Sequence, residues 1–137
     1  MSQSLPVVVV VGSLHYDIMV DAPDRPRKGE TVTGTAWRPK FGGKGGNQAV
    51  AAAQAGADVR MAGAIGDDGF GAFLLEKLQA GGVDPQHIAK LPAVGSGMSV
   101  AISDAEGDYG AVIVSGANLE ISHDAVADPA LWDGARA

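Results

Sequence analysis

The stretch Phe41-Gly-Gly-Lys-Gly-Gly-Asn-Gln48 decides how the rest of this chain is interpreted. Its four glycines surround a single cation, Lys44, and Asn47 follows them. Glycine has no Cβ atom, so a ligand can approach such a backbone closely. A helix is expected from Ala49 to Ala55, and free N–H groups at a helix start favour oxyanions or sugar hydroxyl oxygens. The stretch therefore predicts a pocket floor; the alternative is that its glycines serve only tight turns or close helix packing.

Neither common nucleotide-binding motif fits the glycine-rich stretch. A phosphate-binding P-loop has Ser or Thr after its lysine, whereas Gly45 and Gly46 follow Lys44 here. A dinucleotide fingerprint directly follows the first strand, whereas that strand is expected to end near Gly12. Another class of ligand is therefore expected.

The composition is that of a folded domain. A chain of 137 residues with 46% hydrophobic and 19% charged residues is too apolar to be disordered. Its net charge of −6 argues against nucleic acid and anionic membranes as partners. It has no cysteine, and the Val7–Val11 run is too short to span a bilayer and lacks the basic flank of a signal peptide. We therefore expect a cytoplasmic protein.

Two apolar runs predict the strands of a parallel sheet. Val7–Val11 shows no alternation, which is typical of a strand buried on both faces, and Val59–Ile65 has the same character. The helix expected between them completes a βαβ unit, so the fold class is α/β with a parallel central sheet. Asp67 and Asp68 lead into a further helix, and we expect them to cap its N–H groups rather than to bind a metal.

Four further segments are expected to be short strands. They are Ile18–Asp21 and Thr31–Arg38, which have mixed faces, and Met98–Ser103 and Tyr109–Val114. The last two flank a five-residue polar turn, which indicates an antiparallel hairpin. The first two segments need not belong to the central sheet and could form a flap over the glycine-rich stretch.

Polar side chains follow the first strand. Ser13, His15 and Asp17 come at its carboxyl end, which is the edge where open α/β sheets bind ligands. Asp17 is therefore a candidate binding residue, and the alternative is that it caps a turn. His15 is a second candidate, although a lone histidine is more often a hydrogen-bonded structural residue.

The chain ends where a further strand is expected. Ser122 should cap a last helix that Gly134 stops, and a strand should follow. Only two central strands are expected, and a sheet so small is marginal alone. We therefore expect residues 1–137 to be part of a larger domain; the alternative is a natural short form or an obligate oligomer.

The glycine-rich stretch resembles the first signature of the ribokinase-like (PfkB) carbohydrate kinase family. That signature has a glycine pair, an asparagine, a small residue and two spaced glycines, matched here by Gly42-Gly43, Asn47, Ala49, Gly56 and Gly66. The resemblance extends over nearly the whole chain, through Val9–Ser13 with Asp17, Gly29–Gly34, Phe41–Ala53, Gly66–Asp68 and Ser115–Asn118.

The resemblance implies the N-terminal part of a ribokinase-like αβα sandwich with a small β lid. The lid segments would lie near residues 18–38 and 98–114, and the lid would also serve as a homodimer contact. The implied reaction is ATP-dependent phosphorylation of a sugar hydroxyl. ATP, magnesium and potassium are the implied cofactors, with their sites outside this chain.

The resemblance also implies roles for single residues. Asp17 would accept hydrogen bonds from sugar hydroxyls, Gly43 would offer backbone contacts, and Lys44 and Asn47 would add side-chain donors. The family has asparagine where this chain has His15, so the sugar stays open between ribose, another pentose, a hexose and a nucleoside.

The family's second signature, Gly-Ala-Gly-Asp, is absent from this chain. Its aspartate is the catalytic base, so no catalytic residue is assigned here. The leading hypothesis is the sugar-binding portion of a carbohydrate kinase, inactive by itself. The alternative is a non-catalytic short form that binds a sugar or self-associates through its lid strands, and a remnant without function is a third reading.

Overall fold

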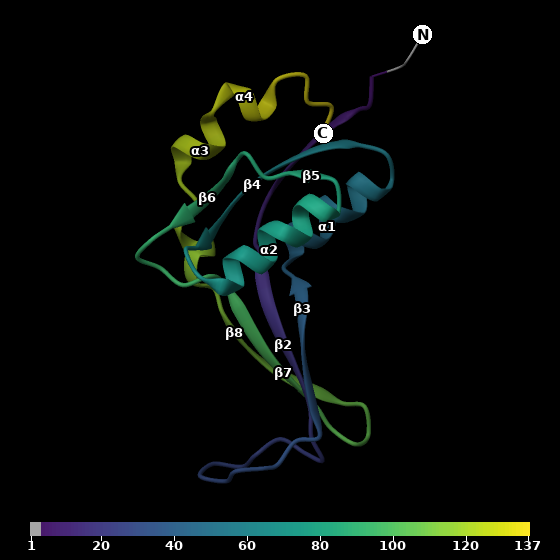
Figure 1. Cartoon of the computed structure of the whole chain (residues 1–137), viewed down its shortest axis with the longest axis vertical. Helices are drawn as coiled ribbons and strands as arrows, with labels where there is room; N and C mark the ends of the chain where they lie inside the picture. Colours follow the sequence, from purple (N-terminus) through teal and green to yellow (C-terminus); the bar gives the residue numbers. More distant parts are fainter. Residues whose placement is uncertain (1–3) are drawn as a thin grey trace.

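Two sheets organise the computed structural model, which describes residues 4–137 (Figure 1). In the central sheet β4 pairs in parallel with three other strands; the four are β1 (Val7–Val11), β4 (Asp58–Gly66), β5 (Val83–Asp84) and β6 (Ile88–Leu91). The second sheet, here called the lid sheet, has the order β3-β2-β7-β8 and projects away from the helices. Its strands are β2 (His15–Asp21), β3 (Ala36–Gly42), β7 (Met98–Ser103) and β8 (Tyr109–Val114).

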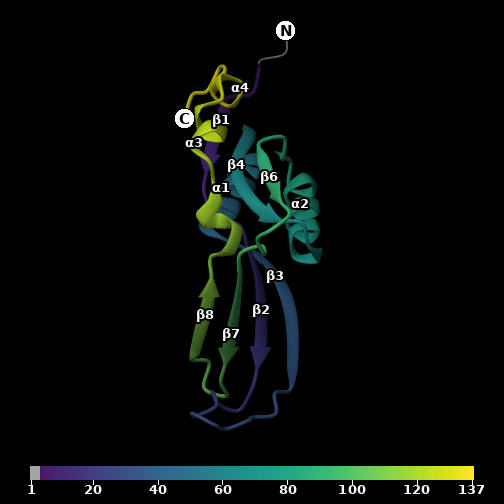
Figure 2. The same ribbon diagram turned by 90° about the vertical axis from the view of Figure 1, so that its left-hand side faces the viewer.

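Helices cover the central sheet on both faces (Figure 2). On one side lies α2 (Gly69–Ala80), whose C-terminal end packs against α1 (Lys44–Gln54); on the other lie the 3-10 helix η1 (Gly116–Glu120), α3 (His123–Ala127) and α4 (Pro129–Trp132). The largest fully buried core side chains come from these layers and from the turn after β1: Leu14, Met61, Ile65, Leu74, Leu78, Leu131 and Val59. Burying each such side chain stabilises the fold by roughly 1.5–3 kcal/mol. This arrangement confirms the expected α/β class.

No helix within residues 4–137 is long and apolar enough to cross a bilayer.

The central sheet has more strands than the sequence predicted. Val7–Val11 and the strand around Val59–Ile65 are confirmed, but β5 and β6 were not expected. β5 contains only two residues and is followed by Pro85, which has no N–H to continue a ladder. The expectation of a two-stranded sheet was therefore wrong.

Helix α1 starts at Lys44, five residues before the predicted start at Ala49. Glycine normally disfavours a helix interior, but here the first turn passes directly over the turn after β1. A Cβ atom on Gly45 would lie 2.7 Å from the carbonyl carbon of Gly12, and one on Gly46 would lie 2.7 Å from the Phe41 ring. These two glycines are therefore needed for close packing, as the alternative interpretation of the stretch proposed.

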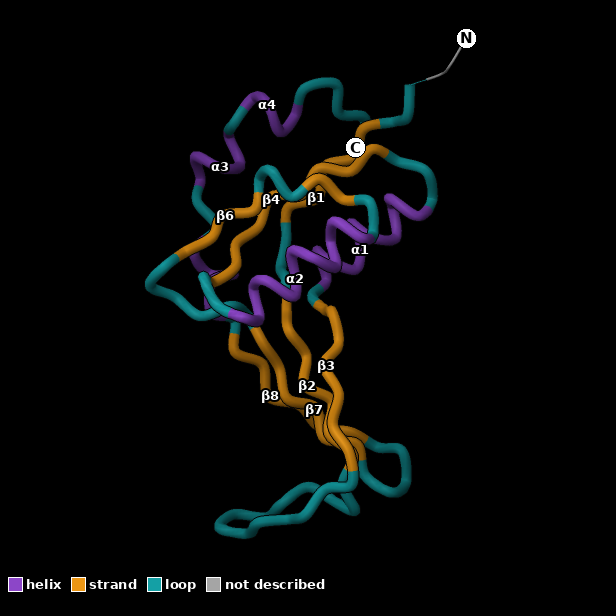
Figure 3. The backbone as a smooth tube through the Cα atoms, viewed as in Figure 1, coloured by secondary structure: helices purple, strands orange, loops and turns teal. Residues whose placement is uncertain are grey.

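The first two lid strands begin and end elsewhere than predicted. β2 starts at His15, so Asp17 lies within a strand and caps no turn. Residues 31–35 carry no regular structure, because β2 ends at Asp21, whose partner on β3 is Ala36. The threonines before Ala36 thus have no strand to pair with, and they lie in the long loop beyond the lid strands (Figure 3). The predicted hairpin strands β7 and β8 are confirmed.

The last part of the chain returns to the central sheet. Ser122 caps α3 as predicted, since its Oγ accepts a hydrogen bond from the Ala125 N–H at 3.0 Å. The single helix expected there is instead two short helices, because Pro129 cannot continue the first. After Gly134, the Arg136 N–H donates to the Val7 carbonyl at 2.8 Å and the Val9 N–H donates to the Ala137 carbonyl at 2.7 Å. Residues 135–137 therefore lie alongside β1.

Candidate functional site

All five residues singled out from the sequence line one cavity of about 850 Å³. His15 and Asp17 come from β2, and Gly43, Lys44 and Asn47 come from the N-terminal end of α1. The cavity lies between the lid sheet and this helix end. It is therefore built where the two sheets meet, beyond the carboxyl end of β1.

Among the described residues 4–137, Asp17 is the only carboxylate that lines the cavity. Its Oδ1 accepts a hydrogen bond from the Ser99 hydroxyl at 2.6 Å. Its Oδ2 lies where a Cβ atom would stand on residue 42, so Gly42 is required for this orientation. A carboxylate has about four lone-pair sites, and Asp17 accepts no other hydrogen bond from residues 4–137. It therefore keeps acceptor capacity for a ligand.

The lid sheet forms one wall of the cavity, where small side chains leave open space. Side chains alternate between the two faces of a strand, and small ones face the cavity: Ser99, Ala101 and Ser103 from β7 and Ala111 from β8. Tyr109, Ile113 and Leu119 add apolar surface.

On the opposite face of β2, Tyr16 stacks on Phe70 of α2 with ring centroids 4.0 Å apart. This contact fixes β2 and hence the orientation of Asp17.

The N-terminal end of α1 presents backbone and flexible donors to the cavity. Gly43 precedes the helix with φ of 96°, in the left-handed region that favours glycine. Lys44 and Asn47 are exposed, and their side chains form no hydrogen bond or ion pair with residues 4–137. Gly43 thus serves the predicted pocket floor, while Gly45 and Gly46 serve packing, and both interpretations of the glycine-rich stretch hold.

Asn118 is a cavity residue that reasoning from the residues did not assign to the site. Its Oδ1 accepts from the Leu14 N–H at 2.9 Å, and its Nδ2 donates to the carbonyls of Leu14 and Ser115, both at 2.9 Å. These bonds tie the turn between β1 and β2 to the segment after β8. Only the similarity of Ser115–Asn118 to the family pattern pointed to it. Because these three bonds use its amide, Asn118 is a positioning residue.

Asp68 caps α2 as predicted and also accepts hydrogen bonds from Ser96. It accepts hydrogen bonds from the Gly71 N–H at 2.8 Å, the Ser96 N–H at 2.9 Å and the Ser96 hydroxyl at 2.7 Å. Partial burial raises the pKa of this carboxyl, but the hydrogen bonds from Ser96 and Gly71 outweigh it, so the pKa lies below its ordinary value. Asp67 does not cap the helix as predicted; its carboxylate is exposed, 4.0 Å from Lys90 Nζ.

Within residues 4–137, no three His, Cys, Asp or Glu side chains lie close enough together to hold a metal ion.

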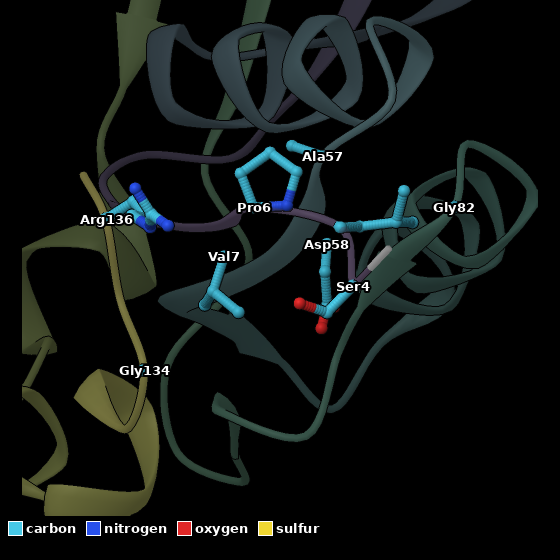
Figure 4. A pocket seen from close by; sticks show the side chains of 9 residues that line it. Ser4, Pro6, Val7, Ala57, Asp58, Gly82, Gly134 and Arg136 are labelled. Atoms are coloured by element: carbon cyan, nitrogen blue, oxygen red, sulfur yellow. The ribbon is translucent and has the colours of Figure 1, made fainter. Parts of the chain in front are cut away.

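A second cavity of about 710 Å³ lies at the other end of the central sheet (Figure 4). Its lining includes Pro6, Val7, Asp58 and Arg136, and none of the five candidate residues. It lies at the amino ends of β1 and β4, whereas open α/β sheets bind ligands at the carboxyl ends. The cavity beside Asp17 is therefore the candidate functional site.

The sequence profile of a known family matches most of the chain. The family is described as "pfkB family carbohydrate kinase", and the match covers residues 6–133. A curated relative, the ribokinase of Bacillus subtilis (strain 168), is 44% identical over 115 residues, which are 84% of this chain and 39% of the relative.

Solved structures show the same architecture. The ribokinase from Cryptococcus neoformans in complex with ADP has a TM-score of 0.73 and 37% identity, over 82% of this chain and 35% of that one. The Arabidopsis thaliana ribokinase complexed with ribose and ATP has a TM-score of 0.77 and 31% identity, over 85% of this chain and 38% of that one. The chain spans about two fifths of the length of these relatives.

Proposed function

The chain belongs to the pfkB family of carbohydrate kinases, and on that premise we propose that it carries the sugar-binding part of an enzyme that phosphorylates a sugar hydroxyl with ATP. The observation that carries this proposal is the convergence of Asp17, His15, Gly43, Lys44 and Asn47 on one cavity. The ribose and ATP bound by the Arabidopsis thaliana relative support a sugar and ATP as the ligands.

Asp17 is proposed to hold two sugar hydroxyls. Its carboxylate is oriented by Ser99 and keeps free lone pairs toward the cavity. Hydrogen bonds to a charged acceptor contribute about 1.5–3 kcal/mol each. The Asp17 contacts therefore provide the largest part of the sugar's binding energy and fix which hydroxyl is presented for transfer.

The remaining cavity residues are proposed to orient the sugar. The Gly43 backbone lets the sugar approach closely, and the Lys44 ammonium and Asn47 amide donate to its oxygens. His15, which is half-buried beside Asp17, presents an imidazole to a further hydroxyl. The apolar wall excludes water from the sugar, which protects ATP from hydrolysis once the site closes.

We further propose that residues 1–137 are the N-terminal portion of a pfkB domain. The catalytic base and the ATP, magnesium and potassium sites would come from the part of the domain that the relatives possess beyond the match. Phosphoryl transfer depends on those groups for positioning and charge stabilisation. The chain by itself would then bind sugar without transferring phosphate, acting in the cytoplasm and with neither nucleic acid nor membrane as partner.

A fused enzyme tests the proposal. Residues 1–137 joined to the remaining part of the Bacillus subtilis ribokinase should form ADP only when sugar is present. Asp17→Ala should lower kcat/KM by about a hundredfold or more, because two charge-assisted hydrogen bonds are lost. Asp21→Ala is the matched control, since Asp21 lies on the same strand but outside the cavity, 3.5 Å from Arg38. Full activity of the Asp17→Ala enzyme would remove Asp17 from the sugar site.

A second candidate function, self-association through the lid, is favoured by exposed apolar residues on the lid sheet. Trp37, Val112 and Val114 are 66%, 68% and 52% exposed, on the face turned away from the cavity. Such a surface is typical of an interface. Sedimentation should show a dimer of the isolated chain that Val112→Lys dissociates; a monomer at all concentrations would rule this function out.

A further inference from the structure

The cavity beside Asp17 is positively charged although the chain is acidic. Among its charged lining residues are two lysines, Lys40 and Lys44, and one carboxylate, Asp17. The whole chain has a net charge of −6. Neither lysine has a carboxylate within 4.0 Å among residues 4–137. Both ammonium groups are therefore available to a ligand, and the charge of the cavity favours an anion.

Lys40 has a specific place in this cavity. It lies on β3 directly opposite Asp17 in the antiparallel ladder of β2 and β3, and both side chains face the cavity. Residues paired in this way have Cβ atoms about 5 Å apart, close enough for an ion pair. Asp17 is instead held by Ser99 and lies against Gly42, so it does not pair with Lys40.

The next acid and base on the same ladder behave differently. Asp21 lies on β2 four residues after Asp17, and its Oδ2 is 3.5 Å from Arg38 Nη1. Both residues are outside the cavity lining. The ladder can therefore form an acid–base pair between two residues that do not line the cavity. In the cavity, by contrast, Asp17 and Lys40 form no ion pair.

We infer that the sugar bound at this site carries an anionic group, either a carboxylate or a phosphate, that contacts Lys40. The inference rests on the proposed function and specifies its substrate class. Asp17 and Lys40 line the same cavity from neighbouring strands, so a pentose or hexose in the cavity can contact both side chains. The hydroxyl end meets Asp17 and the anionic end meets Lys40. Lys44 adds to the positive potential from the start of α1.

Binding of three related sugars to the full chain tests the inference. Calorimetry would compare ribose, which is neutral, with ribonate, which has a carboxylate, and with ribose 5-phosphate. At low salt, at least one anionic sugar should bind about tenfold tighter than ribose, as expected for one charge-assisted hydrogen bond. Added salt should reduce this preference. The arm that shows the larger preference identifies the anionic group as carboxylate or phosphate.

Two variants assign the preference to Lys40. Lys40→Met keeps most of the length of the side chain but removes its charge, and it should bring the ratio of anionic to neutral affinity close to one. Arg38→Met removes a cation from the same strand outside the cavity, and it should leave the ratio as in the native chain. An unchanged ratio in Lys40→Met would overturn the role of Lys40.

The outcomes separate this inference from the proposed function. If ribose binds as tightly as both anionic sugars, the inference is wrong and the sugar-binding function stands. If none of the three sugars binds, the proposed function itself fails and the inference fails with it.

Discussion

The start of α2 and the lid-sheet cavity each contain an aspartate hydrogen-bonded to a serine hydroxyl, yet the two sites differ in how much acceptor capacity remains. Asp68 accepts three hydrogen bonds, two from Ser96 and one from the Gly71 N–H. Asp17 accepts one, from Ser99, and faces a cavity. A carboxylate whose partners all belong to the protein stabilises structure. A carboxylate that is oriented but not saturated is available for a ligand.

The surroundings of the two aspartates match this difference. The Ser96 Oγ that donates to Asp68 also accepts from the buried Gly66 N–H at 2.8 Å, so three chain segments converge on one network. Around Asp17, small side chains leave open space instead. The comparison therefore predicts that substitutions around Asp68 change the stability of the fold and that substitutions around Asp17 change ligand binding.

The largest effect expected from this comparison is on stability. Asp68→Ala removes the cap of α2 and leaves the Ser96 N–H and hydroxyl without their acceptor, so the free energy of unfolding should fall by about 2 kcal/mol. Urea unfolding of the native chain and the variant measures it. Asp67→Ala is the matched control, since Asp67 is exposed and caps nothing, and it should change stability by less than about 0.5 kcal/mol. Equal stability of Asp68→Ala and the native chain would contradict a structural role for Asp68.

The sequence predicted the elements whose signal is local. The unbroken valines of β1, the hairpin of β7 and β8 and the Ser122 cap of α3 depend on neighbouring residues, and all are confirmed. The start of α1 depends on distant packing, because its glycines are accommodated against Gly12 and Phe41. Two-residue β5 also exists only because β4 pairs with it. Such tertiary effects are absent from local patterns.

The candidate site was predictable as a set of residues but not as a geometry. The five predicted residues converge on one cavity, from a strand and a helix start that are far apart in sequence. Ser99, which orients Asp17, is 82 positions away, and no local signal distinguishes it from other strand serines. Local patterns did not assign Asn118 and Lys40 to the site for the same reason, since the role of Asn118 comes from hydrogen bonds between distant segments and that of Lys40 from strand register.

A smaller effect is expected at the serine that orients Asp17. Ser99→Ala should weaken sugar binding about fivefold, equivalent to about 1 kcal/mol, because the carboxylate loses one orienting hydrogen bond but keeps its charge. Stability should change by less than for Asp68→Ala, since Asp17 can turn toward water in the open cavity. Calorimetry with the preferred sugar and urea unfolding of the same sample give both values. A variant that loses stability but keeps native sugar affinity would show that the Ser99 hydrogen bond is structural, like that of Ser96.

The smallest effect is the pH dependence of stability that Asp68 contributes. The pKa of this carboxyl is lower in the folded chain than its value of 3.8 in the absence of structure. Its contribution is therefore present above about pH 4 and is lost as the pH falls through the lowered pKa of the folded state. Asp68→Asn should weaken the dependence of stability on pH in this acid range, because the amide oxygen still accepts a hydrogen bond but does not titrate.

Urea unfolding at pH 7 and pH 3 should show a smaller stability difference between the two pH values in the variant than in the native chain. Asp68 is exposed, and solvent screens its charge. The pH-dependent part of the stability should therefore be only a fraction of the stability lost in Asp68→Ala. Identical pH profiles for both proteins would mean that the Ser96 and Gly71 hydrogen bonds do not favour the charged carboxylate.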